Sequence, residues 1–152
     1  MIAGEASAVV RASPAEVLDF FCDLERYKEA DTKIRAVLGV EPTGGDTVVR
    51  IRSRIRGLPT PPVRQLVKRT GDERVDVADI TAVLSRLVSF RAWVTCAPQA
   101  TGTLVTHREE LEVRGPLKPL AERWLGAWWA QDIYDEVGRL ARILGPVEAV
   151  AP

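Results

Sequence analysis

The sequence predicts an α+β fold in which a curved antiparallel sheet of seven strands wraps around one long C-terminal helix. Three observations support this fold class. A strand pattern at the N-terminus is followed by signals for two short helices. A period-two pattern then runs from Ile34 to Val113 with turn residues between its segments. Finally, no proline interrupts residues 120–145. Strands joined by short turns pair antiparallel, so the middle of the chain should form one sheet.

The first strand is expected at residues 6–12, which are mostly small or β-branched. Three start signals for a helix follow it. Ser13 can cap the first free amides, Pro14 suits the first helical position, and Glu16 completes a capping box. Residues 23–27 are expected to form a second short helix.

Six further strands are expected in the middle of the chain, at residues 34–41, 46–56, 63–69, 74–81, 90–97 and 102–113. Turn-forming residues separate them, at 42–45, 71–72 and 98–101. Residues 57–62 should be a loop because their three prolines cannot donate sheet hydrogen bonds. Residues 82–89 fit either one turn of helix or an apolar loop.

The C-terminal helix is expected at residues 120–145, up to ~25 residues or ~37 Å long. Its second half has one apolar stripe, formed by Ile133, Val137, Leu140 and Leu144. In its first half the other side carries Leu120, Trp124, Ala127, Trp128 and Gln131. The helix therefore has two apolar faces or bends near Gly126. The tail, residues 146–152, is expected to fray.

Length and composition limit the classes of protein. A chain of 152 residues fits one domain, expected at 1–152 with its core at about 6–145. The 21 basic and 21 acidic residues give zero net charge, which argues against nucleic-acid binding. No apolar run reaches the ~20 residues of a membrane span, and the start lacks a signal-peptide pattern. The two cysteines are expected to be free thiols in a cytoplasmic protein.

Metal and cofactor signals are weak. The chain has a single histidine, His107, which excludes a site with two histidine ligands from one chain. Neither a phosphate-binding glycine loop nor a dinucleotide-binding fingerprint is found. We therefore expect no metal and no cofactor.

A cavity follows from the expected architecture. A helix is only ~10–12 Å wide with its side chains, so one helix cannot fill the hollow of so wide a sheet. The space that remains is large enough to raise the question of what fills it, and a small molecule is the expected occupant.

Three segments carry a resemblance to a known family. They are residues 8–17 (AVVRASPAEV), 23–27 (DLERY) and 102–106 (GTLVT). With the order of elements, they resemble the START-like helix-grip (SRPBCC) superfamily, and most of all its polyketide cyclase/dehydratase-related branch, over about residues 6–145. The resemblance implies the helix-grip fold and a role among aromatase/cyclases, hydrophobic-ligand carriers and hormone receptors. Residues 28–30 (KEA) depart from the pattern, since a proline and an aromatic are common there, so that lip of the cavity is expected to differ.

The strand at 102–113 holds the candidate catalytic pair. Its alternation places His107 and Glu109 on the more apolar face, which should line the cavity. An imidazole tuned by a carboxylate is a suitable general acid/base, as aldol cyclisation and dehydration of a poly-β-ketone require. In the alternative, His107 bonds a neighbour and Glu109 pairs with an arginine. A β-bulge would reverse the two faces.

Further side chains are expected to bind the ligand. The apolar side of the strand at 46–56 should face the cavity. The aromatic residues of the last helix, together with Trp93, could line the cavity, form ordinary core or make a dimer interface. The expected ligand-binding residues are Val49, Ile51, Ser53, Ile55, Trp93, Val105, Trp124, Trp128, Gln131 and Tyr134.

The opposite face of the same strand is a stripe of four arginines, Arg50, Arg52, Arg54 and Arg56. This stripe could hold an anionic ligand or the acidic surface of a carrier protein. The apolar residues on the other face favour a solvated outer surface instead, with pairing to acids such as Glu41 and Asp76.

The leading hypothesis is a protein that binds a hydrophobic small molecule (polyketide-like, aromatic or lipid), with cyclisation or dehydration by His107 and Glu109 as its enzymatic form. The alternative is a carrier or sensor without chemistry. A third hypothesis is a module that docks a protein partner, and a homodimer or a contact with a carrier protein is the macromolecular partner considered.

Overall fold

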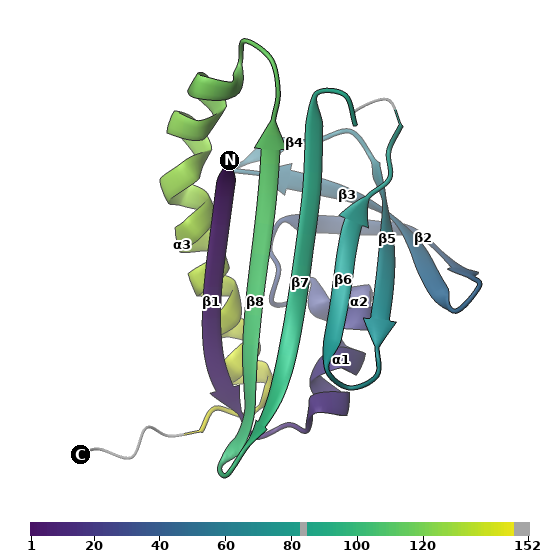
Figure 1. Cartoon of the computed structure of the whole chain (residues 1–152), viewed down its shortest axis with the longest axis vertical. Helices are drawn as coiled ribbons and strands as arrows, with labels where there is room; N and C mark the ends of the chain where they lie inside the picture. Colours follow the sequence, from purple (N-terminus) through teal and green to yellow (C-terminus); the bar gives the residue numbers. More distant parts are fainter. Residues whose placement is uncertain (83–84, 148–152) are drawn as a thin grey trace.

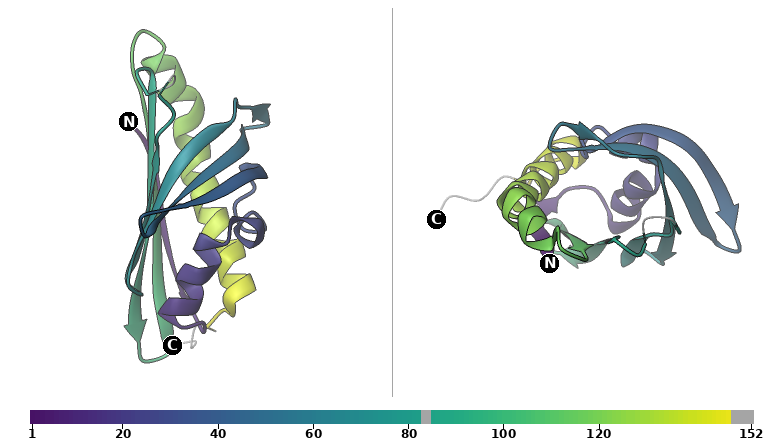
Figure 2. Two further views of the ribbon diagram at one scale, coloured as in Figure 1. Left: turned by 90° about the vertical axis from the view of Figure 1, so that its right-hand side faces the viewer. Right: turned by 90° about the horizontal axis from the view of Figure 1, so that it is seen from above.

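The computed structural model describes residues 1–82 and 85–147, and shows a strongly curved sheet with a long helix along its concave side (Figure 1, Figure 2). The elements in chain order are β1 (Ile2–Val10), α1 (Pro14–Cys22), α2 (Leu24–Tyr27), β2 (Ile34–Thr43), β3 (Asp46–Ile55), β4 (Leu58–Pro59), β5 (Val63–Thr70), β6 (Arg74–Asp79), β7 (Val88–Gln99), β8 (Gly102–Val113) and α3 (Lys118–Leu144). This is the predicted helix-grip architecture.

The sheet is antiparallel throughout, in the order β1-β8-β7-β6-β5-β3-β2. The first strand pairs with the last one, which closes one side of the sheet under α3. The seven strands of this path correspond to the seven predicted ones. The predicted loop at 57–62 also contains the two-residue strand β4, which pairs with β3 off the path.

The start of α1 confirms the predicted capping box. The Ser13 hydroxyl accepts a hydrogen bond from the Glu16 amide, and the Glu16 carboxylate accepts one from the Ser13 amide at 2.7 Å. Pro14 occupies the first turn, where its missing N–H is not needed. The second helix also forms as predicted, with the Asp23 side chain accepting from the Arg26 amide.

β1 begins earlier than predicted, at Ile2 rather than residue 6, because its register with β8 continues to Leu111. Gly4 lies where this extension passes α3. A Cβ atom on Gly4 would come within 2.8 Å of Ile133 Cγ1. The glycine therefore lets the strand and the helix approach closely.

The predicted turn at 42–45 is tighter in the structure. Thr43 pairs with Asp46, so only Gly44 and Gly45 form the loop, both with positive φ. Such a two-residue loop favours glycine. Residues 83–84 and 148–152 lie outside the described residues, and so do the corresponding parts of the expectations for 82–89 and for the tail.

Helix α3 starts two residues earlier than predicted, with Pro119 in its first turn. One stripe between Leu125 and Leu140 is buried: Leu125, Trp129, Ile133, Glu136, Val137 and Leu140. The second-half stripe was predicted correctly. Of the first-half set, only Trp128 is partly buried, beside Trp129, so that prediction mostly identified the outer side of the helix. The exposed members are Leu120, Trp124, Ala127 and Gln131. None of the described helices combines the length and apolarity that a membrane span requires.

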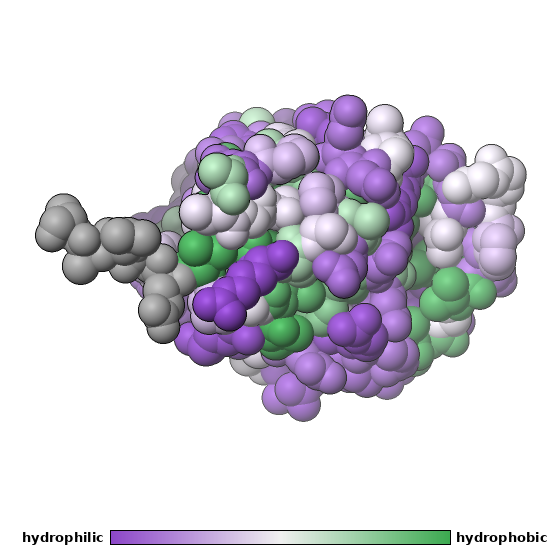
Figure 3. Space-filling view, turned by 90° about the horizontal axis from the view of Figure 1, so that it is seen from below, coloured by the Kyte–Doolittle hydropathy of each residue, from purple (hydrophilic) through white to green (hydrophobic). Residues whose placement is uncertain are grey.

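The core has two apolar clusters. One lies where α1 and the C-terminal half of α3 meet the sheet, and includes Phe20, Phe21 and Leu140. The other lies under the N-terminal half of α3, around Trp129 and Leu111. On the face seen from below, hydrophilic side chains dominate and apolar ones appear in patches between them (Figure 3).

Candidate functional site

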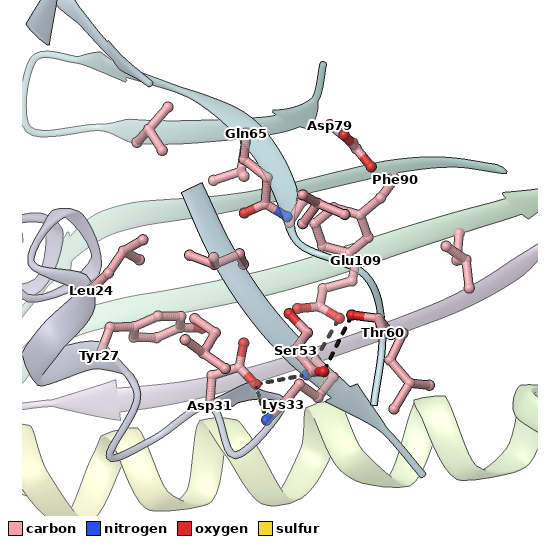
Figure 4. Close-up of a pocket in the computed structure, with 18 of the residues that line it drawn as sticks. Leu24, Tyr27, Asp31, Lys33, Ser53, Thr60, Gln65, Asp79, Phe90 and Glu109 are labelled. Atoms are coloured by element: carbon pink, nitrogen blue, oxygen red, sulfur yellow. Dashed lines mark hydrogen bonds and ion pairs between the residues drawn. The ribbon is translucent and has the colours of Figure 1, made fainter. Parts of the chain in front are cut away.

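A cavity of about 380 Å³ lies between the concave face of the sheet, the two short helices and α3. This volume falls within the range of ~300–1,000 Å³ that is typical of small-molecule sites. Its lining is mainly aliphatic and aromatic, with a few polar side chains that include Ser53, Gln65 and Glu109 (Figure 4). The loop that contains β4 contributes Thr60 and Pro61.

The side chains of β3 lie as the alternation predicted. Ile51, Ser53 and Ile55 line the cavity, whereas the expected ligand contacts Val49 and Val105 are packed in the first apolar cluster instead. Both are β-branched residues on inward-facing positions, but they lie beyond the end of the cavity, where α1 fills the space.

Trp93 meets the cavity in a different way from the expectation. Trp93 is among the lining residues, but its ring lies on the outer face of β7. There the guanidinium carbons of Arg74 and Arg108 lie 5.4 and 5.7 Å from the ring centroid. The neighbours Ala92 and Val94 are the buried, inward residues of this strand. Trp93 contributes its backbone carbonyl to the site.

On α3 the aromatic residue that lines the cavity is Trp129, together with Leu125. The four expected contacts on this helix lie outside the lining: Trp124, Trp128, Gln131 and Tyr134. Tyr134 is 68% exposed. Because helical residues advance by about 100° each, the stripe through Leu125, Trp129 and Ile133 takes the inner face and turns the expected residues away from it.

The candidate catalytic pair lies at the cavity wall, as the alternation of β8 predicted. His107 and Glu109 are both 3% exposed, and the register of β8 with both neighbours is continuous, so no bulge reverses its faces. His107 Nδ1 donates a hydrogen bond to the Trp93 carbonyl at 3.2 Å. His107 Nε2 lies 3.4 Å from Glu109 Oε1 and 3.2 Å from Glu136 Oε1, and neither contact has hydrogen-bond geometry.

These two residues belong to a larger set of buried groups and the partly buried Asp132, which we call the Lys33 cluster: Tyr27, Asp31, Lys33, His107, Glu109, Asp132 and Glu136. Lys33 Nζ is its centre. It lies 2.7 Å from Asp132 Oδ2, 2.8 Å from Glu136 Oε2, 3.2 Å from Asp31 Oδ1 and 3.5 Å from Glu109 Oε2. The Tyr27 hydroxyl donates to Glu136 Oε1.

Sequence reasoning missed most of this cluster. One signal was present, because Glu136 interrupts the apolar stripe of α3 between Ile133 and Val137, and a buried carboxylate needs a partner. Lys33 and Asp31 precede β2 in a segment without periodicity, so no pattern marked them. They lie in the connection between α2 and β2, and only the folded structure brings this connection against α3.

Burial and charge act in opposite directions on the cluster. Burial disfavours the imidazolium, but the carboxylates of Glu136 and Glu109 outweigh it and raise the pKa of His107 to about 10. Burial and the charge of Glu136 raise the pKa of Asp31 to about 7, despite Lys33. Burial also opposes the charged form of Glu136, but Lys33 and His107 hold its pKa well below the usual range. At neutral pH His107 is therefore an acid rather than a base.

Two triads within the described residues bring ligand atoms close enough for a metal ion, namely His107 with Glu109 and Glu136, and Asp31 with Asp132 and Glu136. Every carboxylate in both triads also contacts the Lys33 ammonium. The ion pairs with Lys33 therefore explain why these carboxylates lie close together, without a metal ion.

Arg50, Arg52 and Arg54 lie exposed on the outer face of β3, as predicted, whereas Arg56 lies in the turn after the end of β3, with a positive φ of 48°. The suggested partner Asp76 pairs with Arg74 instead, at 2.6 Å. Arg56 stacks on Trp124, with 5.3 Å from its guanidinium carbon to the ring centroid, and donates to the Trp124 carbonyl. Among the described residues, Arg50, Arg52 and Arg54 have no ion-pair partner.

Several solved structures are similar to this one. The di-domain aromatase/cyclase StfQ of the steffimycin pathway has a TM-score of 0.74 at 8% identity, over 94% of this chain and 50% of its own, so this chain spans half of that protein. The Zhui aromatase/cyclase of a Streptomyces species has a TM-score of 0.72 at 13% identity, over 93% and 92%. A START superfamily protein of Mycobacterium smegmatis has a TM-score of 0.65 at 15% identity, over 93% and 98%. At these identities the likeness establishes the shared fold.

No curated protein matches the chain in sequence. A family model does match, and it covers residues 1–145, which include all three segments of the sequence resemblance and the whole Lys33 cluster. The chain belongs to the polyketide cyclase/dehydrase and lipid transport family.

Proposed function

We propose that this protein binds a hydrophobic small molecule inside the cavity, with the polar group of that molecule against the Lys33 cluster. The observation that carries the proposal is the lining itself. Aliphatic and aromatic side chains from β3, β5, β6 and β7 surround about 380 Å³, and one wall supplies a few convergent polar groups. Apolar walls with a small number of placed polar groups are typical of sites that bind and orient a small ligand.

A cavity-filling variant tests this proposal. Ala92 lines the cavity, and its neighbour Arg91 is exposed on the other face of β7. Ala92→Phe should lower the affinity for the neutral fluorescent probe N-phenyl-1-naphthylamine by about tenfold or more, because the new ring takes the ligand's space. Arg91→Phe is the matched control and should bind like the parent protein. Equal binding by both variants, with both folded by circular dichroism, would refute the internal site.

A second candidate function is cyclisation or dehydration of the bound molecule. It is favoured by one observation, the imidazole of His107 and the carboxylate of Glu109 side by side in the lining, 3.4 Å apart. Glu109 would accept the proton of an activated C–H, the resulting enolate carbon would form a bond to a ketone carbon, and His107 would protonate that ketone oxygen. For dehydration, Glu109 would return its proton to His107 and then accept a second proton from the same carbon. The C–O bond would break as a C=C bond forms, and His107 would protonate the leaving hydroxyl, which departs as water.

The two functions separate in one comparison. His107→Gln and Glu109→Gln should abolish turnover of a poly-β-ketone if these groups move the protons, while binding of a neutral probe remains. If neither variant changes the rate or the distribution of products, the acid/base assignment is wrong. If the parent protein also gives the same rate and products as a reaction without protein, the carrier form of the proposed function stands.

A further inference from the structure

The Lys33 cluster holds more negative than positive groups. Four carboxylates lie within 3.5 Å of Lys33 Nζ: Asp31, Glu109, Asp132 and Glu136. His107 is the second group that can be cationic, and it contacts two of the same carboxylates. With both cations charged, the negative groups exceed the positive ones by two when Asp31 is ionised and by one when it is protonated. An uncompensated buried charge is unfavourable, so the cluster is short of cations.

The excess reaches the cavity. Glu109 Oε2 is buried and accepts no hydrogen bond from any described residue, although Glu109 belongs to the lining. Asp79, from the end of β6, adds another carboxylate to the wall (Figure 4). Lys33 is the only lysine or arginine among the described lining residues, and its ammonium already donates to Asp132 and Glu136. Three buried polar atoms of the described lining residues have no hydrogen-bond partner: the donors His107 Nε2 and Trp129 Nε1, and the acceptor Glu109 Oε2. The acceptor that the wall leaves available is therefore a carboxylate oxygen.

We infer that the ligand of this cavity is a hydrophobic molecule with a protonated amine, and that Glu109 Oε2 accepts a hydrogen bond from its ammonium group. The inference rests on the proposed function, because it requires a ligand inside the cavity. An ammonium supplies the missing positive charge, and a hydrogen bond between two charged groups is stronger than a neutral one. A ligand carboxylate would add the charge that is already in excess, which opposes binding.

Two other groups bear on this choice. Burial and the charge of Glu136 raise the pKa of Asp31 to about 7, so this carboxyl is partly protonated at neutral pH and should release a proton when a cation arrives. Trp129 Nε1, also buried without a partner among the described residues, is a neutral donor and leaves the charge balance unchanged.

Three probes of equal chain length test the inference: decylamine, decanol and decanoate. Each competes at neutral pH for the site occupied by N-phenyl-1-naphthylamine. Decylamine should bind about tenfold or more tighter than decanol, and decanoate should bind weakest. Glu109→Gln should lower the affinity for decylamine until it is close to the affinity for decanol. Glu110→Gln, one residue along β8 on the opposite face and paired there with Arg108, should keep it.

Calorimetry on the parent protein gives a second measurement that needs no variant. Decylamine binding should release protons near pH 7, measured in buffers of different ionisation enthalpy, whereas decanol should release none.

Equal affinity for the three probes, or a preference for decanoate, would overturn the inference and leave the proposed function intact. A preference that survives in Glu109→Gln would overturn the role of Glu109. Failure of the fluorescent probe and of all three competitors to bind would refute both proposals.

Discussion

Two walls of the same cavity bury very different groups. The apolar wall, formed by Ile51, Val67, Val75 and Val77 of the sheet, repeats one simple pattern of alternating residues. The Lys33 cluster opposite joins four segments through ion pairs and hydrogen bonds: α2, the residues before β2, β8 and α3. The apolar wall can hold many ligands of suitable size, because the hydrophobic effect has no direction. The cluster imposes charge and orientation, so the selectivity of the site resides there.

Removing the central cation of the cluster should have the largest effect. Lys33→Met keeps the approximate length of the side chain but leaves four carboxylates facing each other. We expect a loss of about 3–5 kcal/mol in the free energy of unfolding, because one partner of a buried ion pair is lost. Chemical denaturation measures it. Adding Glu136→Gln to Lys33→Met should recover part of the loss, and an unchanged stability in Lys33→Met would contradict the buried charges.

The pH dependence of stability should show the same cluster. The pKa of His107 rises from 6.5 to about 10 on folding, so its contribution is complete below pH 6.5 and is lost as the pH approaches 10. The contribution of Asp31 to stability is likewise lost as the pH rises from about 4 to 7, because folding raises its pKa as well. Glu136, whose pKa is lowered, contributes above its usual pKa and loses this as the pH falls.

Stability should therefore be greatest on the acid side of neutrality and decrease toward pH 10. Lys33, Glu109 and Asp132 also face these groups. Denaturation midpoints measured at intervals of pH test the prediction. In His107→Gln the decrease above pH 7 should become smaller, and a curve identical to that of the parent protein would exclude His107 as its cause.

Substitutions in the apolar wall should cost less stability than substitutions in the Lys33 cluster. Val77→Ala removes two methyl groups beside space that already exists, and we expect a loss of about 1 kcal/mol in stability. Probe affinity should decrease only slightly, with no change in the order of charged and neutral ligands. Arg50→Ala, on the exposed stripe of β3, is the control and should change stability by less than about 0.5 kcal/mol. If Val77→Ala altered the preference for charge, the division between the two walls would be wrong.

The two walls also differ in how far the sequence predicted them. The inward faces of β3 and β8 follow from period-two alternation, which is a local property, and the structure has both as predicted. The inner face of the first half of α3 was predicted wrongly. Trp124 and Trp128 were expected to line the cavity, but the stripe through Leu125 and Trp129 faces the sheet. The role of Lys33 could not be predicted, since the two carboxylates of α3 that accept its hydrogen bonds lie about a hundred residues away and only the folded chain brings them together.

The central claim is that a ligand occupies the space between these walls. Nuclear Overhauser contacts between bound decylamine and the methyl groups of the protein test it most directly. The account predicts contacts from the alkyl chain to Ile51, Val75 and Val77, and from the carbon next to the nitrogen to protons of Glu109. Contacts confined to exposed groups, such as Leu38 and Val40 of β2 or Trp124 of α3, would contradict it.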